Sequence, residues 1–150
     1  MYINKYLPEF VYWGIDGIVT TFAVVAGATG ANLDLSVVLI LWFANLFADG
    51  FSMSVGAYLS AKSETSQDDS KTPLGSGLAT FLAFVLFGFV PLLTYVIAFR
   101  WNLGESSIFP LSIVLTALAF IAIGVMKISV THSHWIRSVL ETLILGWLAA

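Results

Sequence analysis

The sequence predicts an all-α membrane protein with five transmembrane helices, an inner N-terminus and a fifth helix that is short or truncated. Composition is the first reason: 59% of residues are hydrophobic and 10% are charged, where soluble domains average about 25% charged residues. Length is the second, because several apolar runs reach the roughly 20 residues that a helix needs to cross a hydrocarbon core. The chain is therefore predicted to be a single transmembrane domain over residues 1–150.

Apolar runs place the helices along the chain. The first four predicted helices cover residues 11–31, 35–61, 74–99 and 110–126. The fifth, 138–150, is shorter than the roughly 20 residues of a full crossing. The first run is long enough to remain as an anchor, so we expect no cleavable signal peptide. Pro91 stands in the middle of the third run and is expected to kink that helix, because proline has no N–H to donate.

Basic residues predict the orientation in the membrane. If the N-terminus is inside, only Arg100 lies on the outer side, which is the distribution that the positive-inside rule favours. The odd number of helices then places the C-terminus outside. Trp42 lies inside a run, whereas the other Trp residues lie near run ends, as interfacial anchors do. The inner basic residues are Lys5, Lys62, Lys71, Lys127 and Arg137.

The longest polar connection, 62–73, permits two interpretations. It is either a solvated linker or a segment whose acids, Glu64, Asp68 and Asp69, attract cations to the inner side. The chain has no cysteine, which excludes disulfides and thiolate ligands. Its sequence holds no nucleophile triad pattern, glycine-rich phosphate loop or basic stripe, so soluble enzyme chemistry and nucleic-acid binding have no support.

Polar residues gather on one side of the second run. At about 100° per residue, one arc of this helix holds an amide, a carboxylate, a hydroxyl and a thioether. The residues of the arc are Asn45, Asp49, Ser52, Met53 and Gly56. A carboxylate in lipid costs about 2.5–3.5 kcal/mol on insertion scales. Asp49 is therefore a candidate functional residue.

The first run carries a second acid. Asp16 shares a face with the small residues Thr20, Ala23, Gly27 and Gly30. Small residues at this spacing let two helices approach closely, so we expect a partner helix on this face, with Asp16 beside it. A homodimer that joins through the first helix would bring the two Asp16 side chains together on the twofold axis.

Axial distances put Asp16 and Met53 at similar depths. At a rise of about 1.5 Å per residue, Asp16 lies roughly 8 Å and Met53 roughly 12 Å from the inner ends of their helices. We expect the two to share one site, with Asp49 and Asn45 continuing the path outward. Carboxylate, amide and thioether donors suit Fe²⁺, Mn²⁺ or Co²⁺, whereas Mg²⁺ and Ca²⁺ gain nothing from sulfur.

Each of these residues also has a structural interpretation. Met53 can be core filler, Asp16 can be an interfacial acid that reaches water, and Asp49 can accept an interhelical hydrogen bond. These alternatives stay open at this point.

Three polar residues of the C-terminal part are weaker candidates. His132 and His134 have the spacing of metal ligands, but a histidine pair equally suits an interfacial loop. Glu141 lies four residues after Arg137 and can pair with it along a helix.

Three segments of the sequence resemble the vacuolar iron transporter family. They are GIDGIVTTFAVVAG at 14–27, ANLFADGFSMSVG at 44–56 and FGFVPLLTY at 87–95. The segment RSVLETLILGWLAA at 137–150 is similar to the start of that family's fifth helix. The resemblance covers nearly the whole chain. It implies a five-helix homodimer that moves Fe²⁺, and often Mn²⁺ or other divalent ions, out of the cytosol in exchange for protons.

The resemblance also implies roles for single residues. Asp16 matches an aspartate that binds metal and responds to protons, and Met53 matches a methionine ligand. Asp49 is matched by an aspartate in some members only, and some members carry a glutamate where this chain has Asn45. Plant-like members hold a helical cytosolic metal-binding domain where this chain has only 62–73, so the metal-gathering role of that domain does not transfer.

The leading functional hypothesis is a proton-coupled exporter of divalent transition metals. It has no permanently bound cofactor, and its partners are metal ions, protons, the lipid bilayer and a second copy of the chain. A passive divalent-cation channel and a non-transport scaffold are the alternatives, and none of the three is an enzyme. Compact connections favour a bacterial or archaeal inner membrane, with a vacuolar membrane as the alternative.

Overall fold

The computed structural model describes residues 5–63, 71–101, 104, 107–131, 140 and 144, and all of its long elements are helices. They are α1 (Leu7–Gly30), α2 (Leu35–Ser63), α3 (Pro73–Gly88), α4 (Val90–Arg100) and α5 (Ile108–Thr131). Four stretches are long and apolar enough to cross a membrane: Leu7–Gly30, Leu35–Ser63, Pro73–Tyr95 and Ile108–Lys127. The predicted all-α, membrane-spanning architecture is confirmed for this part of the chain. The predicted fifth helix, 138–150, lies outside the described residues apart from Leu140 and Ile144.

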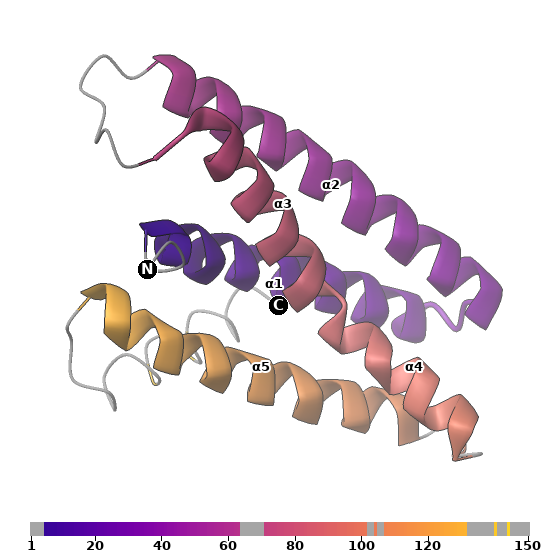
Figure 1. Cartoon of the computed structure of the whole chain (residues 1–150). Coiled ribbons are helices and arrows are strands. Elements are labelled where there is room, and N and C mark those ends of the chain that lie inside the picture. Colours follow the sequence, from indigo (N-terminus) through magenta and orange to yellow (C-terminus); the bar gives the residue numbers. More distant parts are fainter. Residues whose placement is uncertain are drawn as a thin grey trace.

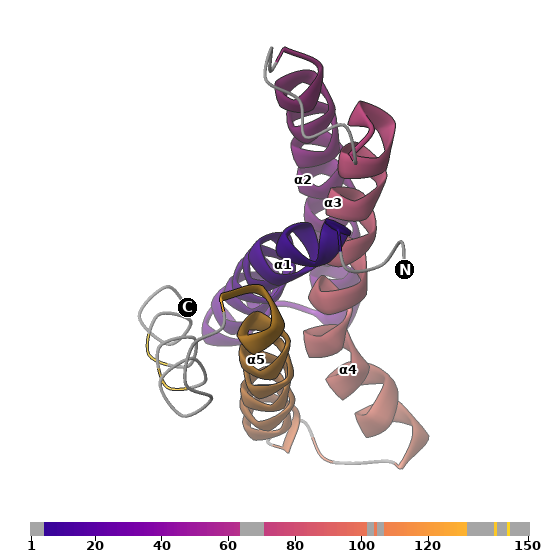
Figure 2. The same cartoon turned by 60° about the vertical axis from the view of Figure 1, so that its left-hand side comes forward.

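The spans alternate in direction, and α1 is central among them. In Figure 1, α1 and the α3–α4 pair run one way while α2 and α5 run the other way. α1 contacts each of the other four helices. Figure 2 shows it between α5 on one side and α2 with α3 on the other. Residues in the middle of α1 are therefore placed to face several helices.

The third predicted helix is broken at one residue, close to the proline that was expected to kink it. α3 ends at Gly88 and α4 begins at Val90, with Phe89 between them. Pro91, in the first turn of α4, has no N–H to donate. The N–H of Leu92 bonds the Phe89 carbonyl oxygen at 3.1 Å, a tighter turn than an α-helix makes. The disruption expected at Pro91 is therefore present, while Pro73–Tyr95 still forms one stretch long enough to cross a membrane.

Glycines of α1 allow its closest approach to α3. A Cβ on Gly17 would collide with the Phe84 carbonyl oxygen, and a Cβ on Gly14 would lie 2.7 Å from the Phe87 ring. The face that the sequence suggested for close packing is open within this chain, since a Cβ on Gly27 or Gly30 would meet nothing within 4 Å. Within one subunit, the α1 glycines that contact another helix are therefore Gly14 and Gly17.

Two apolar clusters hold the helices together. One joins α1, α2, α3 and α4 around Trp42 and Phe84, both fully buried. The other joins α1 to α5 around Ile18 and Phe120. Burial of Trp42 explains its position away from the run ends, since its ring packs edge-on against Phe89 with centroids 5.2 Å apart. Outward faces carry exposed apolar side chains such as those of Leu74, Leu78, Leu82 and Leu86 on α3, as lipid contact requires.

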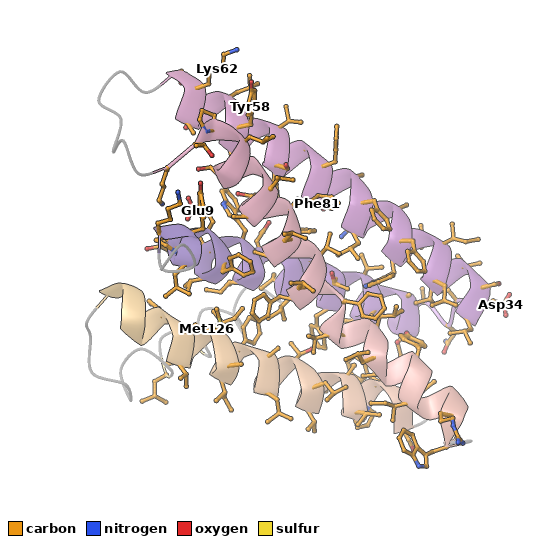
Figure 3. All side chains as sticks on the ribbon, viewed as in Figure 1. Glu9, Asp34, Tyr58, Lys62, Phe81 and Met126 are labelled. Atoms are coloured by element: carbon orange, nitrogen blue, oxygen red, sulfur yellow. The ribbon has the colours of Figure 1, made fainter. Side chains whose placement is uncertain are left out.

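Polar contacts fix the end of the bundle at which α1 and α3 both begin. Lys71 Nζ donates to the Glu9 carboxylate at 2.9 and 3.2 Å. The Thr72 N–H donates to the Tyr6 hydroxyl oxygen at 3.2 Å, and hydrogen bonding to the Thr72 side chain and backbone lowers the pKa of Tyr6. In Figure 3, Glu9 and Lys62 lie toward this end and Asp34 lies at the opposite end.

Candidate metal site

The polar arc of α2 lies at the border of its buried face. The fully buried stripe of this helix is Val38, Trp42, Leu46 and Gly50, at four-residue spacing. Asn45 and Asp49 each precede a member of this stripe by one position, which turns them about 100° away from it. Asn45, Asp49 and Met53 are accordingly half-buried, whereas Ser52 and Gly56 are exposed.

Asp16 lies in the middle of α1, directly before the glycine that packs on α3. Its side chain is half-buried, and α1 contacts α2, the helix that carries Asp49. The Thr20 hydroxyl donates to the Asp16 backbone carbonyl oxygen at 2.9 Å, so this contact does not involve the carboxylate. The structure therefore places two half-buried carboxylates in the middle of two membrane-spanning helices that contact each other.

Met53 and Asn45 flank Asp49, one helical turn to either side, which is about 6 Å along the axis. Met53 packs against the core cluster around Trp42 and Phe84. Asn45 has a buried amide nitrogen, Nδ2, for which the described residues offer no hydrogen-bond partner. Both side chains are thus within one turn of Asp49, with different surroundings.

The donor set of one subunit is small. In the part of the chain that the structure describes, no group of three or more His, Cys, Asp or Glu residues could hold a metal ion. A metal ion at Asp16 and Asp49 would take its other ligands from the Met53 thioether, the Asn45 amide, water or a second subunit. This combination of oxygen donors with one sulfur suits first-row divalent ions.

Several residues that the sequence singled out lie outside the described residues. They are Glu64, Asp68 and Asp69 of the polar connection, together with His132, His134, Arg137 and Glu141. Their proposed roles stay predictions.

The structure also shows polar atoms that sequence reasoning missed. Thr21 Oγ1 and Trp42 Nε1 are buried without a hydrogen-bond partner among the described residues. Nothing in the apolar periodicity marks these two residues, because threonine and tryptophan are common in membrane helices. The role of these two atoms depends on which helix ends lie next to them.

Comparison with known proteins points to one family. The VIT family model matches residues 7–70 and 65–150. A vacuolar iron transporter of Toxoplasma gondii is 51% identical over 61 residues, which are 41% of this chain and 20% of that protein. Arabidopsis thaliana vacuolar iron transporter homolog 4 is 26% identical over 162 aligned positions, covering 97% of this chain and 79% of that protein.

A second Arabidopsis protein, vacuolar iron transporter 1, is 25% identical over 199 aligned positions that cover 90% of this chain and 78% of that protein. No solved structure gives a significant match. The family model spans nearly every residue from 7 to the end of the sequence, and the described helices supply the spans that a membrane protein needs. This chain belongs to the VIT family.

Proposed function

We propose that the chain exports divalent transition-metal ions, Fe²⁺ and also Mn²⁺ or Co²⁺, from the cytosol in exchange for protons. The observation that carries this proposal is that Asp16 and Asp49 are both half-buried in the middle of membrane-spanning helices that contact each other. An acid in lipid costs about 2.5–3.5 kcal/mol on insertion scales, so two acids on contacting spans indicate a functional site. Relatives named vacuolar iron transporter support iron as the substrate.

Exchange of metal for protons follows from the chemistry of the pair. Two neighbouring carboxylates repel each other strongly in a medium of low dielectric. Either a proton or a divalent cation relieves this repulsion, so the two ions compete for the same oxygens. Binding of metal on one side of the membrane therefore releases a proton, and protonation on the other side releases the metal.

A homodimer of five-helix subunits with inner N-termini completes the proposed architecture. The open face at Gly27 and Gly30 offers a second copy close contact along α1, beside Asp16. Lys5, Lys62 and Lys71 lie at the end where α1 begins, which the positive-inside rule assigns to the cytosol. We expect a bacterial or archaeal inner membrane, and localisation of a tagged chain would decide between it and the vacuole that the relatives' names indicate.

Metal flux into liposomes that contain the purified chain tests this function. With a metal indicator inside, Fe²⁺, Mn²⁺ and Co²⁺ entry is followed with and without an imposed pH gradient. If the chain exchanges metal for protons, metal entry is expected to be faster when the pH gradient drives protons out of the liposomes. Flux that ignores the pH gradient would support a passive channel instead, and the absence of flux for every metal would support a scaffold.

Met53 supplies a prediction about metal preference. A thioether adds affinity mainly for softer ions, so Met53→Leu, which keeps the volume but removes sulfur, is expected to weaken Co²⁺ and Fe²⁺ transport more than Mn²⁺ transport. A loss of about tenfold in the apparent affinity for Co²⁺ corresponds to about 1.4 kcal/mol. The measurement is the concentration dependence of initial flux for each metal.

The control for Met53 is the half-buried Met126 of α5, which packs beside the α1–α5 cluster. Met126→Leu makes the same chemical change at a packing position and is expected to leave the order of metal preference unchanged. If Met53→Leu also keeps the wild-type order, Met53 is core packing.

A further inference from the structure

The two acids of the candidate metal site share a local sequence. Asp16 is followed by Gly17 in α1, and Asp49 is followed by Gly50 in α2. Both glycines are buried, whereas both acids are half-buried. Each acid therefore lies one position, or about 100° of helix rotation, away from a glycine that faces a neighbouring helix.

Both glycines contact the same residue of α3, Phe84. A Cβ on Gly17 would collide with the Phe84 carbonyl oxygen and would lie 3.1 Å from the Phe84 Cα atom. A Cβ on Gly50 would lie 3.3 Å from Cδ1 of the Phe84 ring and 3.5 Å from the Phe81 ring. The backbone of Phe84 thus meets α1, while its ring meets α2.

The same three helices meet again one turn later along α3. A Cβ on Gly88 would lie 3.0 Å from the Gly17 carbonyl oxygen and 2.6 Å from Leu46 Cδ1. At this level a side chain on α3 has no room, since even a methyl group would be too close to both neighbours. At the level of the acids, by contrast, the Phe84 side chain fills the space between α1 and α2.

The antiparallel course of α1 and α2 turns both acids to one side of Phe84. In Figure 1, the two helices run in opposite directions. Antiparallel helices that face the same residue are related by an approximate twofold rotation, which exchanges the Asp–Gly pair of α1 with that of α2. Residues that directly precede the facing glycines therefore point to the same side. The spacing between Asp16 and Asp49 then depends on what separates the two glycines, which is Phe84.

Phe84 is packed too firmly to give way. Its side chain is fully buried. It lies in the apolar cluster that also holds Trp42 and Leu46, with Met53 packed against that cluster. Protein interiors are as dense as organic crystals, so a change in the volume of a central side chain moves its neighbours. A change of the ring is expected to move α2, which touches the ring, more than α1, which touches the backbone of Phe84.

We propose that Phe84 is a positioning residue of the metal site, whose ring sets the separation of Asp49 from Asp16 and thereby the size of divalent ion that the site prefers. This inference rests on the proposed metal transport and deepens it, because it assigns selectivity to a residue with no metal-binding atom. Geometry and ligand type decide which divalent ion a protein site selects. Met53 acts through the chemistry of its sulfur, whereas Phe84 acts through size.

Two substitutions that change the spacing in opposite directions test the proposal. Phe84→Leu shortens the side chain against α2 and is expected to favour the smaller Co²⁺ over the larger Mn²⁺ by about tenfold. Gly50→Ala adds a methyl group against the ring and is expected to favour Mn²⁺ to a similar degree. The double variant refills the space and is expected to return to the wild-type preference. The measurement is the ratio of the apparent affinities for the two ions, from competition in initial flux and from metal titration.

Phe120→Leu on α5 is the matched control. Phe120 is also buried, and it joins α5 to α1. The same change there is expected to lower the melting temperature but to leave the ratio of the Mn²⁺ and Co²⁺ affinities unchanged. An equal shift of this ratio in Phe120→Leu would show that any loss of packing alters the preference, and it would overturn the proposal. If Phe84→Leu does not fold, Gly50→Ala and this control still decide.

The spacing of the helices can be measured without metal. The chain has no cysteine, so Tyr12→Cys and Leu59→Cys, at exposed positions of α1 and α2, place one spin label on each helix. Electron paramagnetic resonance reports the distance between the labels in the reconstituted chain, diluted with unlabelled chain so that only pairs within one subunit contribute. Phe84→Leu and Gly50→Ala are expected to shift this distance in opposite directions, and Phe120→Leu to leave it unchanged.

The outcomes separate this inference from the proposed function. A wild-type metal preference in both Phe84→Leu and Gly50→Ala would overturn the role of Phe84 while metal transport stands. An unchanged label distance in both variants, or a double variant that does not regain the wild-type preference, would have the same meaning. A wild-type chain that neither binds nor moves metal would overturn the metal site and this inference together.

Discussion

Asp16→Asn is expected to abolish metal uptake driven by a proton gradient, so that flux falls to the level of protein-free liposomes. Asparagine keeps the size of the side chain but can neither carry a charge nor release a proton at neutral pH. The substitution removes one of the two half-buried carboxylates that α1 and α2 carry. A divalent ion then has one anionic ligand where the wild-type subunit offers two, and a proton no longer competes for the lost oxygen. The measurement is initial uptake of Mn²⁺ and Fe²⁺ under an imposed pH gradient.

Asp34→Asn makes the same chemical change outside the spans. Asp34 is exposed in the connection between α1 and α2, at the far end of the bundle from Glu9 (Figure 3). Exposed substitutions usually change free energies by less than about 0.5 kcal/mol, so this control is expected to transport within about twofold of the wild type. Proton-coupled uptake by Asp16→Asn at the wild-type rate would show that the carboxylate pair is structural. Crosslinking of both variants checks that a loss of flux does not come from failed assembly.

The membrane-spanning helices could be predicted because lipid leaves the chain few alternatives. Every backbone polar group must be satisfied inside the hydrocarbon region, so a long apolar run is almost obliged to be helical. The second helix was accordingly predicted over 35–61, and in the structure it spans Leu35–Ser63. A disruption near Pro91 was predicted, but its form, a break at Phe89, was not. Whether a proline bends or ends a helix depends on its neighbours, and here Gly88 meets Thr21 and Leu46 from two other helices.

Which side chains of the candidate site face each other was harder to predict than how deep each one lies in the membrane. Axial rise places Asp16 close to the depth of Met53, with Asp49 one turn further along α2, but it does not show which of the two the Asp16 side chain faces. Rotation of α1 about its own axis decides which side chain Asp16 faces. That rotation is fixed by the contact of Gly17 with α3. Sequence periodicity shows that α1 has small residues on more than one face, but it does not show which face a neighbouring helix covers.

Gly17→Ala is expected to lower the melting temperature of the purified chain. A methyl group at Gly17 would overlap the Phe84 carbonyl oxygen and would lie 3.1 Å from the Phe84 Cα atom. These are backbone atoms that cannot rotate away, so α1 must move from α3. Overpacking of this kind typically costs about 1–3 kcal/mol. The same shift moves Asp16 relative to Asp49, so metal affinity is expected to fall together with stability. Thermal unfolding in detergent and metal titration measure the two effects.

Gly56→Ala separates the contact with α3 from helix propensity. Gly56 lies in the interior of α2 and is exposed, and a Cβ there would meet nothing within 4 Å. Replacing such a glycine by alanine stabilises a helix by about 0.5–1 kcal/mol, because it restricts the unfolded backbone. The same change from glycine to alanine is therefore expected to raise the melting temperature at Gly56 and to lower it at Gly17. Equal upward shifts at both positions would contradict the α1–α3 contact, since propensity alone acts equally on the two helices.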